Sequence, residues 1–224
     1  MYVDRDKSEE IQEWVRSVIN RLLDVYRFTT GEFYVDSVPA NELWEYEIMD
    51  TNEDGKTFPS PVECRRILPQ GHGVRLARIA SISTEAEQIL HNGSELPIPR
   101  TLYLNAKRAQ LVESYRLAVI EAETAFEVLV DQAVSEYYRG RGASDKEVTS
   151  KLEASLKNLI QDHIPKCCGQ RFEGTLEHTA WESDLYRLRN EVVHDGASVS
   201  TEQAEKALGA AEKALSWVEM RMPA

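Results

Sequence analysis

The chain has 224 residues, of which 42% are hydrophobic and 29% charged, as expected for one large globular domain or two small ones. Its formal net charge of −12 argues against a general nucleic-acid binder, so any contact with RNA is expected to be local. No apolar run is long enough to form a transmembrane helix, and no membrane contact is expected.

The cysteines predict neither a disulfide framework nor a metal site. Cys64, Cys167 and Cys168 are odd in number, two of them are adjacent, and their spacing matches no zinc motif. Free thiols in a reducing cytoplasm are the expectation. No phosphate-binding glycine loop, dinucleotide fingerprint or nucleophile elbow occurs, so no cofactor is expected either.

Residues 1–100 predict a small α/β region. In residues 8–28, apolar side chains recur at helical spacing, and residues 84–91 form a second, short helical segment. Between them, residues 32–38, 44–50 and 74–82 are β-branched, aromatic and partly alternating, which predicts short antiparallel strands. A turn signal at residues 51–56 favours a hairpin. This region is expected to recognise a substrate, a trigger or a partner.

The proline-rich stretch ending at Arg100 predicts a domain boundary, and the sequence beyond it is helical. Four helices are expected over residues 104–138, 145–163, 175–195 and 200–220, joined by short links. Ser200 and Gln203 resemble a capping box at the start of the last helix. Residues 101–224 therefore predict an all-α four-helix bundle, and the whole chain an α+β fold.

The third predicted helix carries two different faces. At 100° per residue, its core stripe consists of Trp181, Leu185, Leu188 and Val192. Asn190 and His194 are four residues apart and lie together on the opposite face, with Arg189 on the flank. Because the bundle core does not need this second face, it predicts a partner surface, for which a symmetric homodimer is the commonest arrangement.

Arg189, Asn190 and His194 suit phosphodiester cleavage without a metal. Histidine exchanges protons near neutral pH, and arginine stabilises charge on a phosphate. In RNA the neighbouring 2′-hydroxyl supplies the nucleophile. The alternative is purely structural, because a cation at a helix C-terminus is favoured by about 0.3–1 kcal/mol and Gly196 is a good cap.

The stretch Arg189-Asn190-Glu191-Val192-Val193-His194 resembles the R-x4-6-H motif of the HEPN superfamily. The likeness covers about residues 101–220, including the long helical stretch SYRLAVIEAETAFEVLV at 114–130. It implies a metal-independent endoribonuclease of a toxin–antitoxin, phage-defence or RNA-processing system. It also implies two motifs that meet across a dimer, an RNA substrate, and an antitoxin or trigger protein. Other members of the superfamily bind nucleotides or RNA without cutting.

Two further groups of residues accompany this resemblance. Acidic residues of the long helix can support the site in HEPN-like proteins, and Glu127 is chosen over Glu121 and Glu123 because it follows the Ala125-Phe126 pair. A solvated helix face is the alternative. At the end of this helix, Tyr138, Arg139 and Arg141 can hold single-stranded RNA by stacking and charge. An exposed helix end with glycine caps accounts for them equally well.

Overall fold

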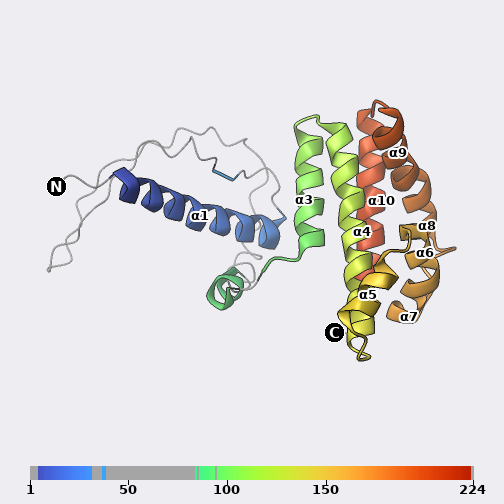
Figure 1. Cartoon of the computed structure of the whole chain (residues 1–224). Coiled ribbons are helices and arrows are strands. Elements are labelled where there is room, and N and C mark those ends of the chain that lie inside the picture. The colour runs from blue at the N-terminus through green and yellow to red at the C-terminus, as the bar shows by residue number, and fades with distance from the viewer. Residues whose placement is uncertain (1–4, 32–36, 39–83, 85, 94, 223–224) are drawn as a thin grey trace. The chain divides into compact units, whose positions relative to one another are not determined.

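The computed structural model describes residues 5–31, 37–38, 84, 86–93 and 95–222. The chain divides into two compact units, Met1–Ser94 and Glu95–Ala224. In the first unit, the described elements are helix α1, Arg5–Thr30, and a short helix over residues 86–92 (Figure 1). Both agree with the helices predicted there. No helix among the described residues is long and apolar enough to cross a membrane.

The predicted α+β fold class is wrong, because the described structure is all-helical. About 79% of it is helix, and the described ranges contain no strand. The predicted strands at residues 32–38, 44–50 and 74–82 lie outside the described residues, except for 37–38, which are irregular. In the described part of the second unit, apolar residues spaced three and four apart have formed helices that bury one side.

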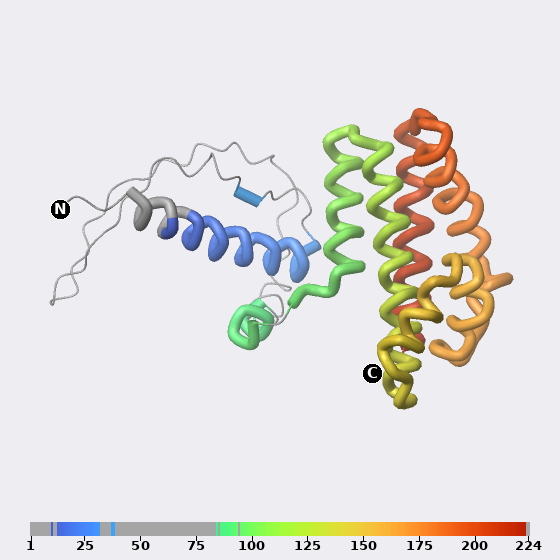
Figure 2. Tube along the Cα trace, viewed as in Figure 1, coloured from blue at the N-terminus to red at the C-terminus, as the bar shows by residue number. Residues whose placement is uncertain are grey.

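The predicted helix over residues 104–138 is two antiparallel helices, α3 (Ile98–Leu111) and α4 (Tyr115–Arg139). Figure 2 shows them side by side, joined by a short turn. The turn exists because Glu113 adopts a left-handed conformation with φ 60°. The Ser114 amide then donates to the Ala109 carbonyl at 2.8 Å and the Glu113 amide to the Gln110 carbonyl at 3.0 Å. These two bonds end α3 with a Schellman cap.

The second predicted helix, residues 145–163, is also interrupted. Helix α5, Asp145–Leu152, begins with a capping box between Ser144 and Glu147. A second helical stretch consists of α6 (Leu156–Asn158), the π-helical turn η2 (Leu159–His163) and α7 (Ile164–Cys168). Pro165 does not end this stretch as expected, because it occupies the first turn of α7, where its missing N–H is not needed.

The third and fourth predicted helices are confirmed. The third is continuous from Leu176 to Asp195 and contains α8 (Leu176–Ala180), η3 (Trp181–Tyr186), α9 (Arg187–Asn190) and η4 (Glu191–Asp195). The fourth is α10, Thr201–Glu219, and the capping box of Ser200 and Gln203 is present. An ion pair between Arg100 and Glu219 joins α3 to α10, so Arg100 belongs to the helical unit.

The core of this unit lies among α4, α10 and the helix at 176–195. Its centre is aromatic: the ring of Phe126 lies 5.5 Å from that of Trp181 and 5.6 Å from that of Phe172, which in turn lies 5.0 Å from that of Trp217. Small side chains of α10 let the helices approach closely. They are Ala204, Ala207, Ala210, Ala211 and Ala214, all buried. The core therefore holds the 176–195 helix by one face only.

Candidate functional site

The helix at 176–195 presents its two faces as the sequence predicted. Trp181, Leu185, Leu188 and Val192 are all buried. On the other side, Asn190 is half-buried and His194 is exposed. The packing of the first set fixes the helix against α4 and α10, so the second set is left at the surface for solvent or a partner.

Two π-helical segments flank the motif. Arg189 and Asn190 lie in α9, between η3 and η4, and His194 lies within η4. π-Helical turns are rare within α-helices and occur frequently at functional sites, because they redirect side chains at a cost in backbone geometry. Gly196, with φ 68°, ends the helix two residues after His194. This backbone irregularity was not predictable from apolar spacing.

Arg189 is held in place rather than free in solvent. Its Nη1 donates to Oδ1 of Asn190 at 3.2 Å. Its Nε is buried and has no hydrogen-bond partner. The buried Nε holds one side of the guanidinium group inside the protein, and the hydrogen bond from Nη1 to the Asn190 amide orients the group.

The carboxylate beside Arg189 is that of Glu123 on α4. Glu123 is only 1% exposed, and its Oε2 accepts a hydrogen bond from Nε1 of Trp181 at 3.0 Å. Burial raises the pKa of Glu123 to about 8; the Trp181 bond lowers it, the charge of Glu127 raises it and that of Arg189 lowers it. Its Oε1 is buried without a partner, as is Nε of Arg189. A buried, mostly protonated acid therefore lies within electrostatic reach of the motif arginine.

Sequence reasoning preferred Glu127 and passed over Glu123. Glu127 is half-buried, and its charge raises the pKa of Glu123 and, after burial, that of Asp131. The three carboxylates follow one side of α4 at four-residue spacing. The missed signal was the core stripe itself, since Val119, Glu123 and Phe126 recur at helical spacing and all are buried.

A second arginine reaches the end of the motif helix from α4. Nη2 of Arg116 lies 3.4 Å from the Val192 carbonyl oxygen, and a Cβ on Gly196 would lie 3.9 Å from the same nitrogen. The Arg116 side chain is otherwise exposed. It adds positive charge where the helix carbonyls end, close to the residues that follow His194.

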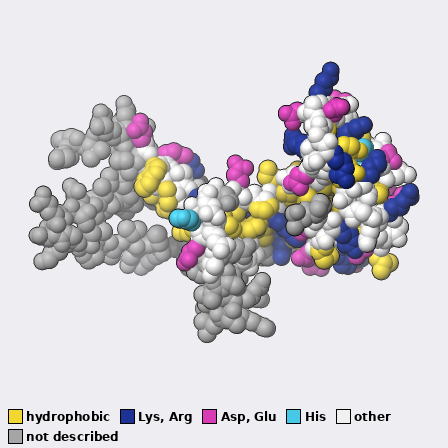
Figure 3. Space-filling view, turned by 90° about the horizontal axis from the view of Figure 1, so that it is seen from below, with side chains coloured by type: hydrophobic (Ala, Val, Ile, Leu, Met, Phe, Trp, Pro, Cys, Tyr) yellow, Lys and Arg dark blue, Asp and Glu magenta, His cyan; other side chains and the backbone are white. Residues whose placement is uncertain are grey.

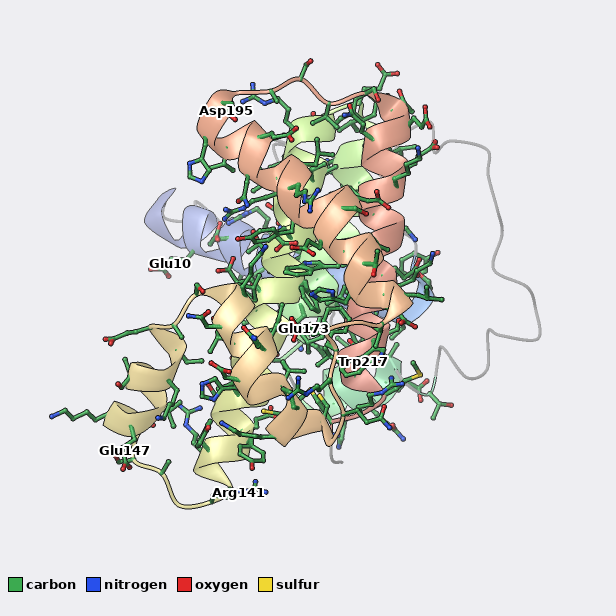
Figure 4. All side chains as sticks on the ribbon, turned by 90° about the vertical axis from the view of Figure 1, so that its right-hand side faces the viewer. Glu10, Arg141, Glu147, Glu173, Asp195 and Trp217 are labelled. Atoms are coloured by element: carbon green, nitrogen blue, oxygen red, sulfur yellow. The ribbon has the colours of Figure 1, made fainter. Side chains whose placement is uncertain are left out.

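The predicted RNA-binding residues lie at the other end of α4. Tyr138 is half-buried, with its hydroxyl 2.9 Å from Nδ1 of His163. Arg139 forms a salt bridge with Asp145, and the Arg141 guanidinium lies 3.6 Å from the centre of the Tyr137 ring. Helix α4 has 25 residues, which separates its ends by roughly 37 Å at 1.5 Å per residue. Figure 4 shows Asp195 and Arg141 at opposite ends of the unit.

The structure thus brings together Arg189 and Asn190, with His194 one turn further along the same helix and the buried Glu123 of α4 near enough for the charge of Arg189 to lower its pKa. It does not bring Tyr138, Arg139 or Arg141 to them within one chain. Among the described residues, no group of three or more His, Cys, Asp or Glu side chains is arranged to hold a metal ion.

Comparisons with known protein families, with curated proteins and with solved structures give no match to this chain. The function of the chain is therefore inferred from the geometry of the site.

Proposed function

We propose that the helical unit is a metal-independent endoribonuclease of the HEPN type that cuts single-stranded RNA. The observation that carries the proposal is the state of the motif: Arg189 donates a hydrogen bond to Asn190 and is electrostatically coupled to the buried Glu123, while His194 is exposed one turn away. A fixed guanidinium and a solvent-accessible imidazole are the two groups that phosphodiester cleavage requires from a protein.

In this reaction the RNA supplies its own nucleophile. The 2′-oxygen attacks the adjacent phosphorus, the bond from phosphorus to the 5′-oxygen breaks, and the products are a 2′,3′-cyclic phosphate and a 5′-hydroxyl. The proton lost by the 2′-hydroxyl and the proton gained by the 5′-oxygen pass through imidazole, the role assigned to His194. Arg189 stabilises the additional charge on the phosphoryl oxygens, and Asn190 orients Arg189.

Glu123 has a specific part in this scheme. With a pKa of about 8, Glu123 is mostly protonated at neutral pH. It therefore accepts the hydrogen bond of Trp181 without neutralising the charge of the Arg189 guanidinium. Glu127, next along the same side of α4, is the second carboxylate assigned to support the motif. Full ionisation of Glu123 above pH 8 would place a negative charge beside Arg189 and weaken its hold on phosphate.

A homodimer completes the proposed site. The motif face carries exposed Val193, 47% accessible, between Asn190 and His194, and the core of one chain does not use it. Two copies of the helix packed through this face would bring two histidines and two arginines around one cleft, so one imidazole acts as base while the other acts as acid. A toxin or phage-defence role, with an antitoxin or trigger protein acting on the 1–94 unit, is part of the same proposal.

The test is incubation of purified protein with mixed single-stranded RNA in EDTA, alongside His194→Ala. Cleavage by the wild type alone, with cyclic phosphate ends, is the expected result. Equal cleavage by both proteins, or by neither with candidate partner proteins added, would reject the proposal.

A non-catalytic HEPN-like module is the alternative, in which the helical unit dimerises or binds a nucleotide or RNA. The observation that favours it is the half-burial of Arg189, whose Nη1 already bonds Asn190. The overall charge of −12 points the same way. This alternative predicts RNA binding or dimerisation without any product that depends on His194.

A further inference from the structure

The end of the helical unit opposite His194 is locally basic in an acidic protein. Residues 139–171 contain seven Lys and Arg against four Asp and Glu, a net charge of +3, whereas the whole chain carries −12. These residues belong to the C-terminal end of α4, to α5, to the α6–α7 stretch and to the turns that follow α4 and α7; α5 and the α6–α7 stretch each pack against α4. Figure 3, a view from below, shows Lys and Arg side chains on this part of the unit, interspersed with Asp and Glu.

The positive charges converge around His163. The histidine is fixed by its 2.9 Å hydrogen bond with the Tyr138 hydroxyl. Burial lowers its pKa, and the nearby charges of Lys166 and Lys151 lower it further against the weaker, opposite effect of Asp162. Two lysines, one from α5 and one from α7, are therefore near enough for their charges to act on the His163 imidazole.

Arg141 extends this cluster onto the end of α4. Burial and Cys168 raise the pKa of Cys167 to about 12, and the charges of Arg141 and Lys166 oppose that rise, so both cations lie near the same thiol. Arg141 is exposed; its guanidinium stacks 3.6 Å from the centre of the Tyr137 ring, and its Nη1 donates to the Tyr137 carbonyl at 3.3 Å.

The three cations Lys151, Lys166 and Arg141 are available to a ligand. All three are exposed, and within the described part of the chain none of them forms a salt bridge. Arg139 and Lys157, in contrast, are occupied by Asp145 and Glu182. Of the side chains predicted to bind RNA, Arg141 belongs to this group of cations, whereas Tyr138 is bonded to His163 and Arg139 is paired with Asp145.

A cavity of about 280 Å³ includes Arg141 in its lining, and Lys166 immediately precedes Cys167, which also lines it. It is lined by Tyr137, Arg141, Cys167 and Met222, with Glu136 as its carboxylate. Glu136 disfavours a phosphate inside, while the aromatic ring, the thiol and the thioether suit a flat, uncharged group. The cavity is thus matched to a nucleobase and the surrounding cations to the phosphates that flank it.

We propose that this end of the unit binds single-stranded RNA, with backbone phosphates on Lys151, Lys166 and Arg141 and one base in the cavity beside Tyr137. The choice of RNA as the ligand rests on the proposed function. The cations and the cavity are features of the structure and do not depend on that function. This surface lies away from the proposed cleavage site. Changes to it should alter the affinity for RNA, whereas changes to His194 should alter the rate of cleavage.

The experiment measures binding of a fluorescein-labelled single-stranded RNA by anisotropy in EDTA, using the full chain. The double variant Lys151→Ala/Lys166→Ala is compared with Lys206→Ala/Lys213→Ala, which removes the same charge from α10. About a tenfold loss of affinity is expected in the first and less than about twofold in the second. The dependence of log K on log salt concentration should also flatten by about 1.4, since each phosphate contact on a single strand contributes about 0.7.

Far-UV circular dichroism verifies that both double variants fold. Equal affinity of the two double variants, or no RNA binding by the wild type, would overturn the inference. His194→Ala should bind like the wild type. Binding that depends on Lys151 and Lys166, in a wild type that never cleaves, would reject the nuclease and leave the RNA-binding surface standing.

Discussion

At the residue scale, the site depends on a buried acid that the sequence marked only indirectly. The placement of Asn190 and His194 together on the outer face of the helix, with Arg189 in the same segment, was predictable because their spacing along the helix is regular. Glu123 was not chosen, because burying a carboxylate in a core stripe is energetically unfavourable unless it has hydrogen-bond partners, and the sequence does not show them. The tryptophan that satisfies it lies 58 positions away, a pairing that no local pattern contains.

The raised pKa of Glu123 predicts a pH-dependent stability. The folded protein holds this proton more tightly than the unfolded chain, whose pKa is near 4.5, so stability should fall as pH rises from about 4.5 to about 8 and then level off. Glu123→Gln keeps an acceptor for Trp181 but does not titrate. Its free energy of unfolding in urea should vary less over that window, the difference being on the order of a few kcal/mol.

The control is Glu127→Gln, which removes a half-buried carboxylate one turn along α4. It should retain the decline seen in the wild type. A Glu123→Gln protein whose stability follows the wild type at every pH would show that Glu123 is ionised in the folded state.

At the element scale, helix existence followed from apolar periodicity, whereas helix ends did not. The 175–195 and 200–220 helices were predicted well because a glycine and a capping box mark their boundaries. The break between α3 and α4 was missed because residues 112–114 read Val-Glu-Ser, with no glycine or proline to signal it. The two π-helical segments around the motif leave no compositional trace at all.

The α3–α4 break predicts a stabilising substitution. Glu113 has φ 60° at the position of a Schellman cap where glycine is strongly preferred. Glu113→Gly should therefore raise the free energy of unfolding by up to about 1 kcal/mol, measured in urea. Glu113→Ala keeps the Cβ and should give no gain; equal effects of the two variants would contradict the observed turn.

At the scale of the whole molecule, composition and charge did not indicate the fold class. The α+β assignment failed because it rested on alternation in residues 32–38, 44–50 and 74–82, almost all outside the described ranges, while every described element proved helical. The helical unit was predictable as a bundle, since four periodic segments with short links have few other ways to bury their stripes.

The proposed composite site predicts the mass of the protein in solution. At micromolar concentration, light scattering should give twice the 25.5 kDa of one chain. Val193→Asp places a charge on the exposed motif face and should shift the population to monomer, because an unpaired carboxylate would be buried in the interface. A monomeric wild type would remove the composite site.

The central claim is that the motif face of the 176–195 helix performs catalysis, and two neighbouring arginines test it most directly. Arg187 and Arg189 belong to the same short helix α9, but Arg187 is exposed and Arg189 is the one fixed by Asn190. Single-turnover rates of RNA cleavage should fall by a factor of about 10²–10³ in Arg189→Ala and by less than about threefold in Arg187→Ala. Equal rates in the two variants would contradict the account.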